Sequence, residues 1–169
     1  MDTSLLDRAV IFAVRAHAGG ARKGKNLPYI VHPLEAVAIV ATISDDQELL
    51  AAAALHDVVE DTDTSTEQLR AEFGDRVASL VSADTNPPRV AGDTWRSRKQ
   101  AALDRLAASS RDAKTVAIGD KLSNLRAITN DRQAVGELLW QRFKAPGGRE
   151  DIEWYYRGLA ASLADLAGT

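Results

Sequence analysis

The sequence predicts an all-α protein, a helical bundle of one domain that spans residues 1–169. Three observations predict this fold class. The chain is rich in alanine and leucine, which favour helices. β-Branched and aromatic residues form few runs, and aromatic residues make up only 5% of the chain. A length of 169 residues with 45% hydrophobic residues is enough for one full hydrophobic core.

The first predicted helix runs from about residue 4 to residue 18, with its apolar residues spaced to form one buried stripe. Gly19 and Gly20 end this helix. A polar, basic connector over residues 21–30 follows.

The second helix is predicted to begin at His32-Pro33, because proline suits the first helical position and leaves His32 at the cap. It runs to about residue 43. The third helix spans about residues 46–59 and carries an acidic cluster at its C-terminal end.

The later elements are bounded by capping residues, glycine and proline. Ser65 or Thr66 caps a short helix, which Gly74 ends. Loops are predicted at residues 86–93 and 144–148, where proline and glycine gather. The helices of this part are predicted at about 66–73, 75–83, 94–108, 111–128 and 150–166.

Composition excludes several classes of protein. The net charge of −3 and the pI of about 5.6 do not suggest a partner nucleic acid. The absence of cysteine excludes disulfides and thiolate metal sites. No apolar run reaches the roughly 20 residues of a membrane span, and the N-terminus lacks a signal-peptide pattern. We therefore expect a cytoplasmic protein without a membrane partner.

The stretch from His56 to Asp61 is the most informative part of the chain. It combines His56 and Asp57 with two further carboxylates, Glu60 and Asp61, beside apolar sequence. In a continuous helix Glu60 lies four residues after His56, and Asp61 four after Asp57, so each pair shares a face. Carboxylates so close together repel and desolvate one another, and a bound cation relieves this. The stretch therefore predicts a metal site.

Two other segments supply further candidate ligands. His32 lies at a predicted helix start, and Asp120 closes an apolar helical run. With His56 and Asp57 they provide two nitrogen and two oxygen ligands, a set that suits Mn²⁺, Fe²⁺ or Zn²⁺. His17 is expected to be a packing residue.

The same residues predict hydrolytic attack on phosphorus. A divalent cation activates water, and Glu60 and Asp61 are placed to take its proton or orient it. Asn124 follows Asp120 by four residues and shares its side of the helix, as a substrate contact would. Candidate cations for the phosphate charge are Lys121, Arg126, Arg96, Arg98 and Lys99.

Four ordered motifs resemble those of the HD-domain hydrolases of the RelA/SpoT type, most closely the stand-alone small alarmone hydrolases. The resemblance covers about residues 9–128. The motifs are Arg22-Lys23, Pro28 to Pro33, His56 to Thr62 and Asp120 to Arg126.

The resemblance implies an all-α fold without a synthetase domain and a single Mn²⁺ held by the four predicted ligands. It also implies removal of the 3′-pyrophosphate from (p)ppGpp, the alarmone of the stringent response, to give GDP or GTP and pyrophosphate. In that family the counterparts of Glu60 and Asp61 act at the water. The counterpart of Asn124 contacts the ribose, and those of Arg22 and Lys23 lie against the base.

Two alternatives stay open. The connector from His17 to Lys23 lacks a glutamine and an arginine that the family usually carries, and the C-terminal segment also departs from the family pattern. The chain could therefore be a phosphohydrolase for another nucleotide, such as a phosphomonoester or NADPH. It could also be a nucleotide-binding module without catalysis, although the intact Glu60-Asp61 pair argues against this.

Overall fold

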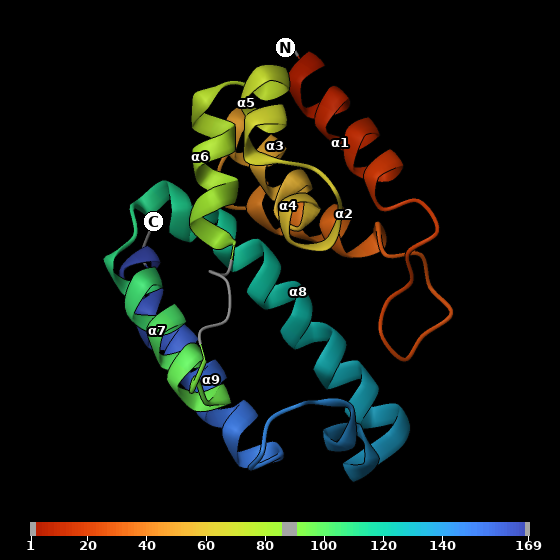
Figure 1. Cartoon of the computed structure of the whole chain (residues 1–169), viewed down its shortest axis with the longest axis vertical. Helices are drawn as coiled ribbons and strands as arrows, with labels where there is room; N and C mark the ends of the chain where they lie inside the picture. Colours follow the sequence, from red (N-terminus) through yellow and green to blue (C-terminus); the bar gives the residue numbers. More distant parts are fainter. Residues whose placement is uncertain (1–2, 86–90, 168–169) are drawn as a thin grey trace.

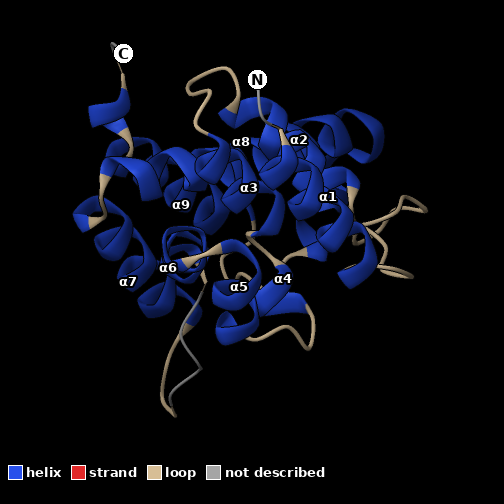
Figure 2. Cartoon of the chain, turned by 90° about the horizontal axis from the view of Figure 1, so that it is seen from above, coloured by secondary structure: helices blue, strands red, loops and turns tan. Residues whose placement is uncertain are grey.

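A computed structural model describes residues 3–85 and 91–167. The described residues form helices joined by loops, as Figure 2 shows, and contain no strand beyond an isolated bridge between Ala21 and Pro28. The all-α prediction is confirmed. Among the described helices, none combines the length and hydropathy that a membrane crossing requires.

The elements follow one another along the chain with mostly short connections. In order, they are α1 (Ser4–Ala16), α2 (Val31–Val40), α3 (Gln47–Leu55), α4 (Val58–Asp61), α5 (Thr66–Phe73), α6 (Asp75–Asp84), α7 (Trp95–Ala108), α8 (Arg111–Val135), the 3-10 helix η1 (Gly136–Arg142), α9 (Arg149–Ser162) and the 3-10 helix η2 (Ala164–Leu166).

The hydrophobic interior consists of two clusters. The larger one surrounds α3, which contacts α1, α2, α6 and α8 and in which every residue from 49 to 55 is buried. The smaller one joins α7 to α9 through Leu103, Leu106, Tyr155 and Leu159, and Ala117 of α8 belongs to it. In Figure 1, α7 and α9 lie side by side, and the long helix α8 runs between them and the N-terminal helices.

Helices α2 and α8 approach closely because Gly119 lies at their crossing. A Cβ atom at this position would stand 2.9 Å from the carbonyl oxygen of Ala36 and 2.9 Å from Cγ2 of Val40. Both distances are too short for a non-bonded contact with carbon. The close approach brings the residue after the glycine, Asp120, toward the N-terminal part of α2.

We expect Gly119→Ala to lower the free energy of unfolding by about 1–3 kcal/mol, because the added methyl group forces a rigid backbone apart. The shift in the urea unfolding midpoint, with an unchanged m value, measures this loss of stability. Gly158→Ala is the matched control. The nearest atoms to its Cβ, the closest of them nearer than any at Gly119, all belong to the Leu103 side chain, and a side chain can shift more easily than the backbone of Ala36, so the loss should be smaller. Equal stability of Gly119→Ala and the native protein would contradict this account.

The predicted cap at Ser65 is confirmed, and the predicted helix start at Thr94 also carries a cap. Ser65 and Gln68 form a reciprocal capping box at the start of α5, and Thr94 and Ser97 form another at the start of α7. Of the predicted loop at residues 86–93, residues 86–90 lie outside the described part of the chain.

Other predicted boundaries were wrong. Helix α1 ends at Ala16, two residues before the predicted end at residue 18. Helix α2 begins at Val31 and ends at Val40, so His32 lies inside the first turn rather than at the cap. Helix α8 continues past residue 128 to Val135, where Gly136 with φ of 61° ends it. The predicted last helix is divided into α9 and η2.

Candidate metal centre and active site

The predicted continuous helix over residues 46–59 is wrong, because α3 ends at Leu55 and α4 begins at Val58. His56 and Asp57 form the turn between them, with Asp57 at φ −98° and ψ −6°. In an unbroken helix, neighbouring side chains point about 100° apart. The turn instead brings His56 Nε2 to 3.0 Å from Asp57 Oδ2, so both side chains face one point.

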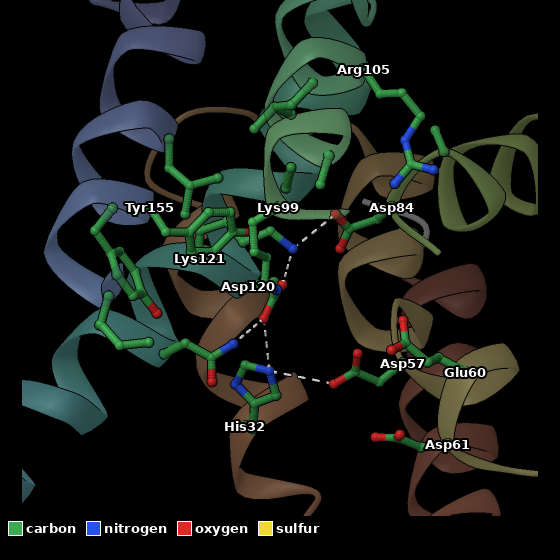
Figure 3. A pocket seen from close by; sticks show the side chains of 18 of the residues that line it. His32, Asp57, Glu60, Asp61, Asp84, Lys99, Arg105, Asp120, Lys121 and Tyr155 are labelled. Atoms are coloured by element: carbon green, nitrogen blue, oxygen red, sulfur yellow. Dashed lines mark hydrogen bonds and ion pairs between the residues drawn. The ribbon is translucent and has the colours of Figure 1, made fainter. Parts of the chain in front are cut away.

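Side chains from α2, the α3–α4 turn and α8 meet at this point. His32 Nε2 lies 3.1 Å from His56 Nε2 and 3.4 Å from Asp57 Oδ2. Asp120 Oδ1 lies 3.1 Å from His32 Nε2 and 3.7 Å from His56 Nε2. Figure 3 shows Asp57 and Asp120 reaching His32 from two sides. The structure thus brings together the four side chains that the sequence predicted as ligands.

The hydrogen bonds of His56 suit a metal ligand. Its Nδ1 lies 2.8 Å from the carbonyl oxygen of Ala53, which can only accept. Nδ1 therefore carries the hydrogen of the neutral ring, and the Nε2 lone pair points at Asp57, Asp120 and His32. A metal-binding histidine is commonly held in this way by its other nitrogen.

The electrostatics of the cluster favour a bound positive charge. Burial works to lower the pKa of His56, but the charges of Asp57 and Asp120 outweigh it and raise that pKa to about 9. Burial also opposes ionisation of Asp57, yet the charge of His56 holds its pKa well below the usual range. A divalent ion supplies the charge that the His56 proton otherwise provides. The donor set therefore fits a metal.

The two carboxylates are held by neighbouring side chains. The Tyr29 hydroxyl donates to Asp57 Oδ2 at 2.6 Å. The Asn124 amide and the Lys121 amine both donate to Asp120, and Lys121 Nζ also lies 3.1 Å from Asp84 Oδ1. Lys121, predicted to contact substrate, lines the cleft, is partly buried between two carboxylates and orients Asp120.

A cleft of about 430 Å³ opens beside the cluster. Glu60 and Asp61 of α4 line it next to Asp57, and Tyr155 lies on the opposite side (Figure 3). Lys99 Nζ lies 4.5 Å from the centroid of the Tyr155 ring, a cation–π contact. Burial and the nearby charge of Lys121 lower the pKa of Lys99.

Two of the predicted substrate contacts near the connector differ in position. Arg22 lines the cleft, donates to Asn124 Oδ1 at 2.9 Å and lies 5.7 Å from the Tyr29 ring centroid. Lys23 does not line the cleft, and its amine donates to the carbonyl of Arg142. The structure therefore brings Arg22, but not Lys23, to the candidate site.

The other predicted cations are engaged elsewhere. Arg96 donates to Asp151, Arg98 to the carbonyl of Thr94, and Arg126 to Glu35. The sequence assigned no role to Trp95, Tyr155 and Tyr156, which form an aromatic wall of the cleft. The one signal for Tyr155 and Tyr156 was the concentration of aromatic residues in the last helix, and Trp95 of α7 had none.

Residues 9–143 match the profile of the HD domain. The chain belongs to the HD domain family. This match covers most of the chain and includes every element that contributes to the cluster. Within the part that the structure describes, His32, His56 and Asp57 form a group able to hold a metal ion, and metal binding is the property that the HD domain implies.

Curated relatives of this HD domain are named for ppGpp hydrolysis. The guanosine-3′,5′-bis(diphosphate) 3′-pyrophosphohydrolase of Danio rerio is 36% identical over 129 residues, which cover 75% of this chain and 70% of that protein. A probable enzyme of the same name from Synechocystis is 35% identical over 127 residues, 73% of this chain. The chain spans only 17% of that longer relative.

A solved structure supports the same relationship. This HD domain superposes with a TM-score of 0.74 on a metazoan ortholog of SpoT that hydrolyses ppGpp. The two are 28% identical, and the match covers 100% of this chain and 89% of the other.

Proposed function

We propose that this chain is a metal-dependent hydrolase that removes the 3′-pyrophosphate of (p)ppGpp, giving GDP or GTP and pyrophosphate. The observation that carries the proposal is the convergence of His32, His56, Asp57 and Asp120 beside one cleft. Three of these residues, His32, Asp57 and Asp120, line the cleft together with Glu60 and Asp61. The substrate follows from the similarity to the Danio rerio enzyme, which covers 70% of that protein. We propose Mn²⁺ as the ion, held by those four residues.

The proposed reaction is hydrolysis at the phosphorus atom bonded to the 3′ oxygen. A divalent ion, when bound, polarises a phosphoryl oxygen and lowers the pKa of water. Glu60 and Asp61 orient the attacking water and accept its proton. The new oxygen–phosphorus bond forms as the bond to the 3′ oxygen breaks, and that oxygen takes up a proton as pyrophosphate leaves.

The lining of the cleft suits a nucleotide that carries several phosphates. Lys99 and Arg22 supply positive charge, and the Tyr155 and Tyr156 rings supply flat apolar surface. A cleft of about 430 Å³ has the size of a small-molecule site. Asn124 links Arg22 to Asp120 and so connects the substrate side of the cleft to the metal ligands.

Incubation of the purified protein with ppGpp and Mn²⁺ tests the proposal. We expect GDP and pyrophosphate, without free phosphate. A panel of other nucleotides, including NADPH and phosphomonoesters, is the comparison. Release of phosphate from one of these, with ppGpp untouched, would favour the alternative phosphohydrolase. Binding of ppGpp without turnover in the metal-loaded protein would favour a module without catalysis.

We expect Lys99→Met to lower kcat/KM for ppGpp by about 10- to 100-fold, because a hydrogen bond to a charged group contributes about 1.5–3 kcal/mol. Steady-state kinetics measures this. Lys25→Met is the control, since the Lys25 amine lies 2.6 Å from Asp131 Oδ1 and does not line the cleft. An equal effect of both substitutions would show that Lys99 has no specific role.

A further inference from the structure

We propose that Glu35 and Ser123 form a hydrogen-bond relay that holds neutral His32 in the tautomer with its hydrogen on Nδ1. The relay leaves the Nε2 lone pair directed at the cluster, ready for the ion. Glu35 and Ser123 are thus positioning residues for the metal. The inference rests on the proposed metal-dependent function and extends it to residues that do not touch the ion.

The direction of each hydrogen bond in the relay follows from donor counting. Ser123 Oγ donates to Glu35 Oε2 at 2.7 Å and lies 2.8 Å from His32 Nδ1. An ionised carboxylate only accepts, and a serine hydroxyl has one hydrogen. Since that hydrogen is directed to Glu35, the oxygen of Ser123 must accept from His32, whose Nδ1 therefore carries the hydrogen.

The two helices bury the His32 and Ser123 members of the relay, while Glu35 lies at its partly exposed end. His32 and Glu35 are three residues apart on α2, so they share one face of that helix. Ser123 follows Gly119 by one turn on α8 and faces them across the close helix crossing. The side chains of His32 and Ser123 are 2% and 1% exposed. Arg126 Nη1 lies 3.5 Å from Glu35 Oε1.

The relay opposes a competing tautomer that the cluster itself favours. Asp120 Oδ1 and Asp57 Oδ2 lie 3.1 Å and 3.4 Å from His32 Nε2, and either would accept a hydrogen from that nitrogen. A ring with its hydrogen on Nε2 cannot bind a metal through Nε2. For His56 the carbonyl of Ala53 prevents this tautomer, whereas His32 depends on two side chains that can be substituted.

Substitution of either relay residue should release the competing tautomer. In Ser123→Ala the Nδ1 hydrogen has lost its acceptor. In Glu35→Ala the Ser123 hydroxyl is free to donate to Nδ1, so the ring hydrogen moves to Nε2. We expect Mn²⁺ affinity to fall by about 10- to 100-fold in each variant, the range typical of residues that orient metal ligands. The double variant should be no weaker than the weaker single variant, because both act through one ring.

Two measurements test the relay. Nitrogen-15 NMR of the metal-free protein, in a pH series that reaches the neutral ring, reports the tautomer of each of the three histidines. Calorimetric titration with Mn²⁺ reports affinity. Thr115→Val is the control for Ser123→Ala, since it removes a buried hydroxyl of α8 that donates to the Arg111 carbonyl of its own helix. Glu153→Ala, which removes a similarly exposed glutamate paired with arginines, is the control for Glu35→Ala.

The expected result is an Nδ1–H ring at His32 in the native protein and the controls, and its loss in Ser123→Ala and Glu35→Ala. An unchanged tautomer in both variants, or Mn²⁺ affinity within twofold of the native value in both, would overturn the relay. The tautomer is read without metal or substrate. Failure of the relay is therefore distinct from failure of the proposed function, which would appear as no Mn²⁺ binding or no ppGpp turnover by the native protein.

Discussion

Glu60→Gln should lower kcat for ppGpp hydrolysis by about 10²- to 10⁴-fold, the range for loss of a general acid or base. Glu60 lines the cleft from α4, one turn after His56, beside the point where the four predicted ligands meet. A glutamine keeps the size of the side chain but cannot take a proton from water. Single-turnover kinetics with saturating Mn²⁺ measures the chemical step.

Mn²⁺ binding separates this effect from loss of the metal. Glu60→Gln should bind the ion with nearly native affinity, because Glu60 is not among the four ligands. Glu67→Gln, at the exposed start of α5, is the matched control and should have native kcat. A native kcat in Glu60→Gln would rule out its role as the base. Loss of Mn²⁺ in this variant would instead make Glu60 a ligand.

Mn²⁺ affinity should rise by about tenfold for each pH unit between pH 6 and 8, about 100-fold in all. The pKa of His56 in the metal-free protein is raised to about 9, so its ring is protonated throughout this range. The ion must displace this proton, and the displacement becomes easier as the pH rises. Titration in two buffers of different ionisation enthalpy should report about one proton released per ion.

The same pKa predicts the opposite trend for the stability of the metal-free protein. The pKa of His56 is raised in the folded state above its ordinary value of about 6.5. Its contribution to stability is therefore complete below about pH 6.5 and is lost as the pH rises through about 9. Urea unfolding in the presence of a chelator measures this trend.

A flat Mn²⁺ affinity from pH 6 to 8, with no proton released, would contradict the assignment of this proton to His56.

Most of the fold could be predicted because helix ends are marked by the residue types at those positions. Ser65 and Thr94 were identified as caps or helix starts from residue type and position alone, and both form capping boxes. The four candidate ligands were also predictable, because histidine and aspartate in short motifs are easily recognised. The structure brings these side chains together from three separate segments.

Contacts between distant segments decided what the sequence could not predict. The helix break at His56 directs its ring toward His32 of α2 and Asp120 of α8, and no local pattern around His56 indicates these contacts. Lys121 lines the cleft, as a substrate contact would, and the sequence did not indicate that Asp84 from α6 lies beside its amine. The position of Tyr155 in the cleft depends on α9 packing against α7, and no motif in either helix indicates this.

The two hydrophobic clusters of the interior support different parts of the candidate site. The candidate ligands lie on elements packed around α3, whereas Lys99 and Tyr155 belong to the α7–α9 pair with its own cluster. Substitutions that repack α7 against α9 can therefore reshape one wall of the cleft while the four candidate ligands stay in place. An HD domain built in this way can acquire a new substrate without rebuilding its catalytic centre, and the α7–α9 pair is the place to begin laboratory evolution of substrate preference.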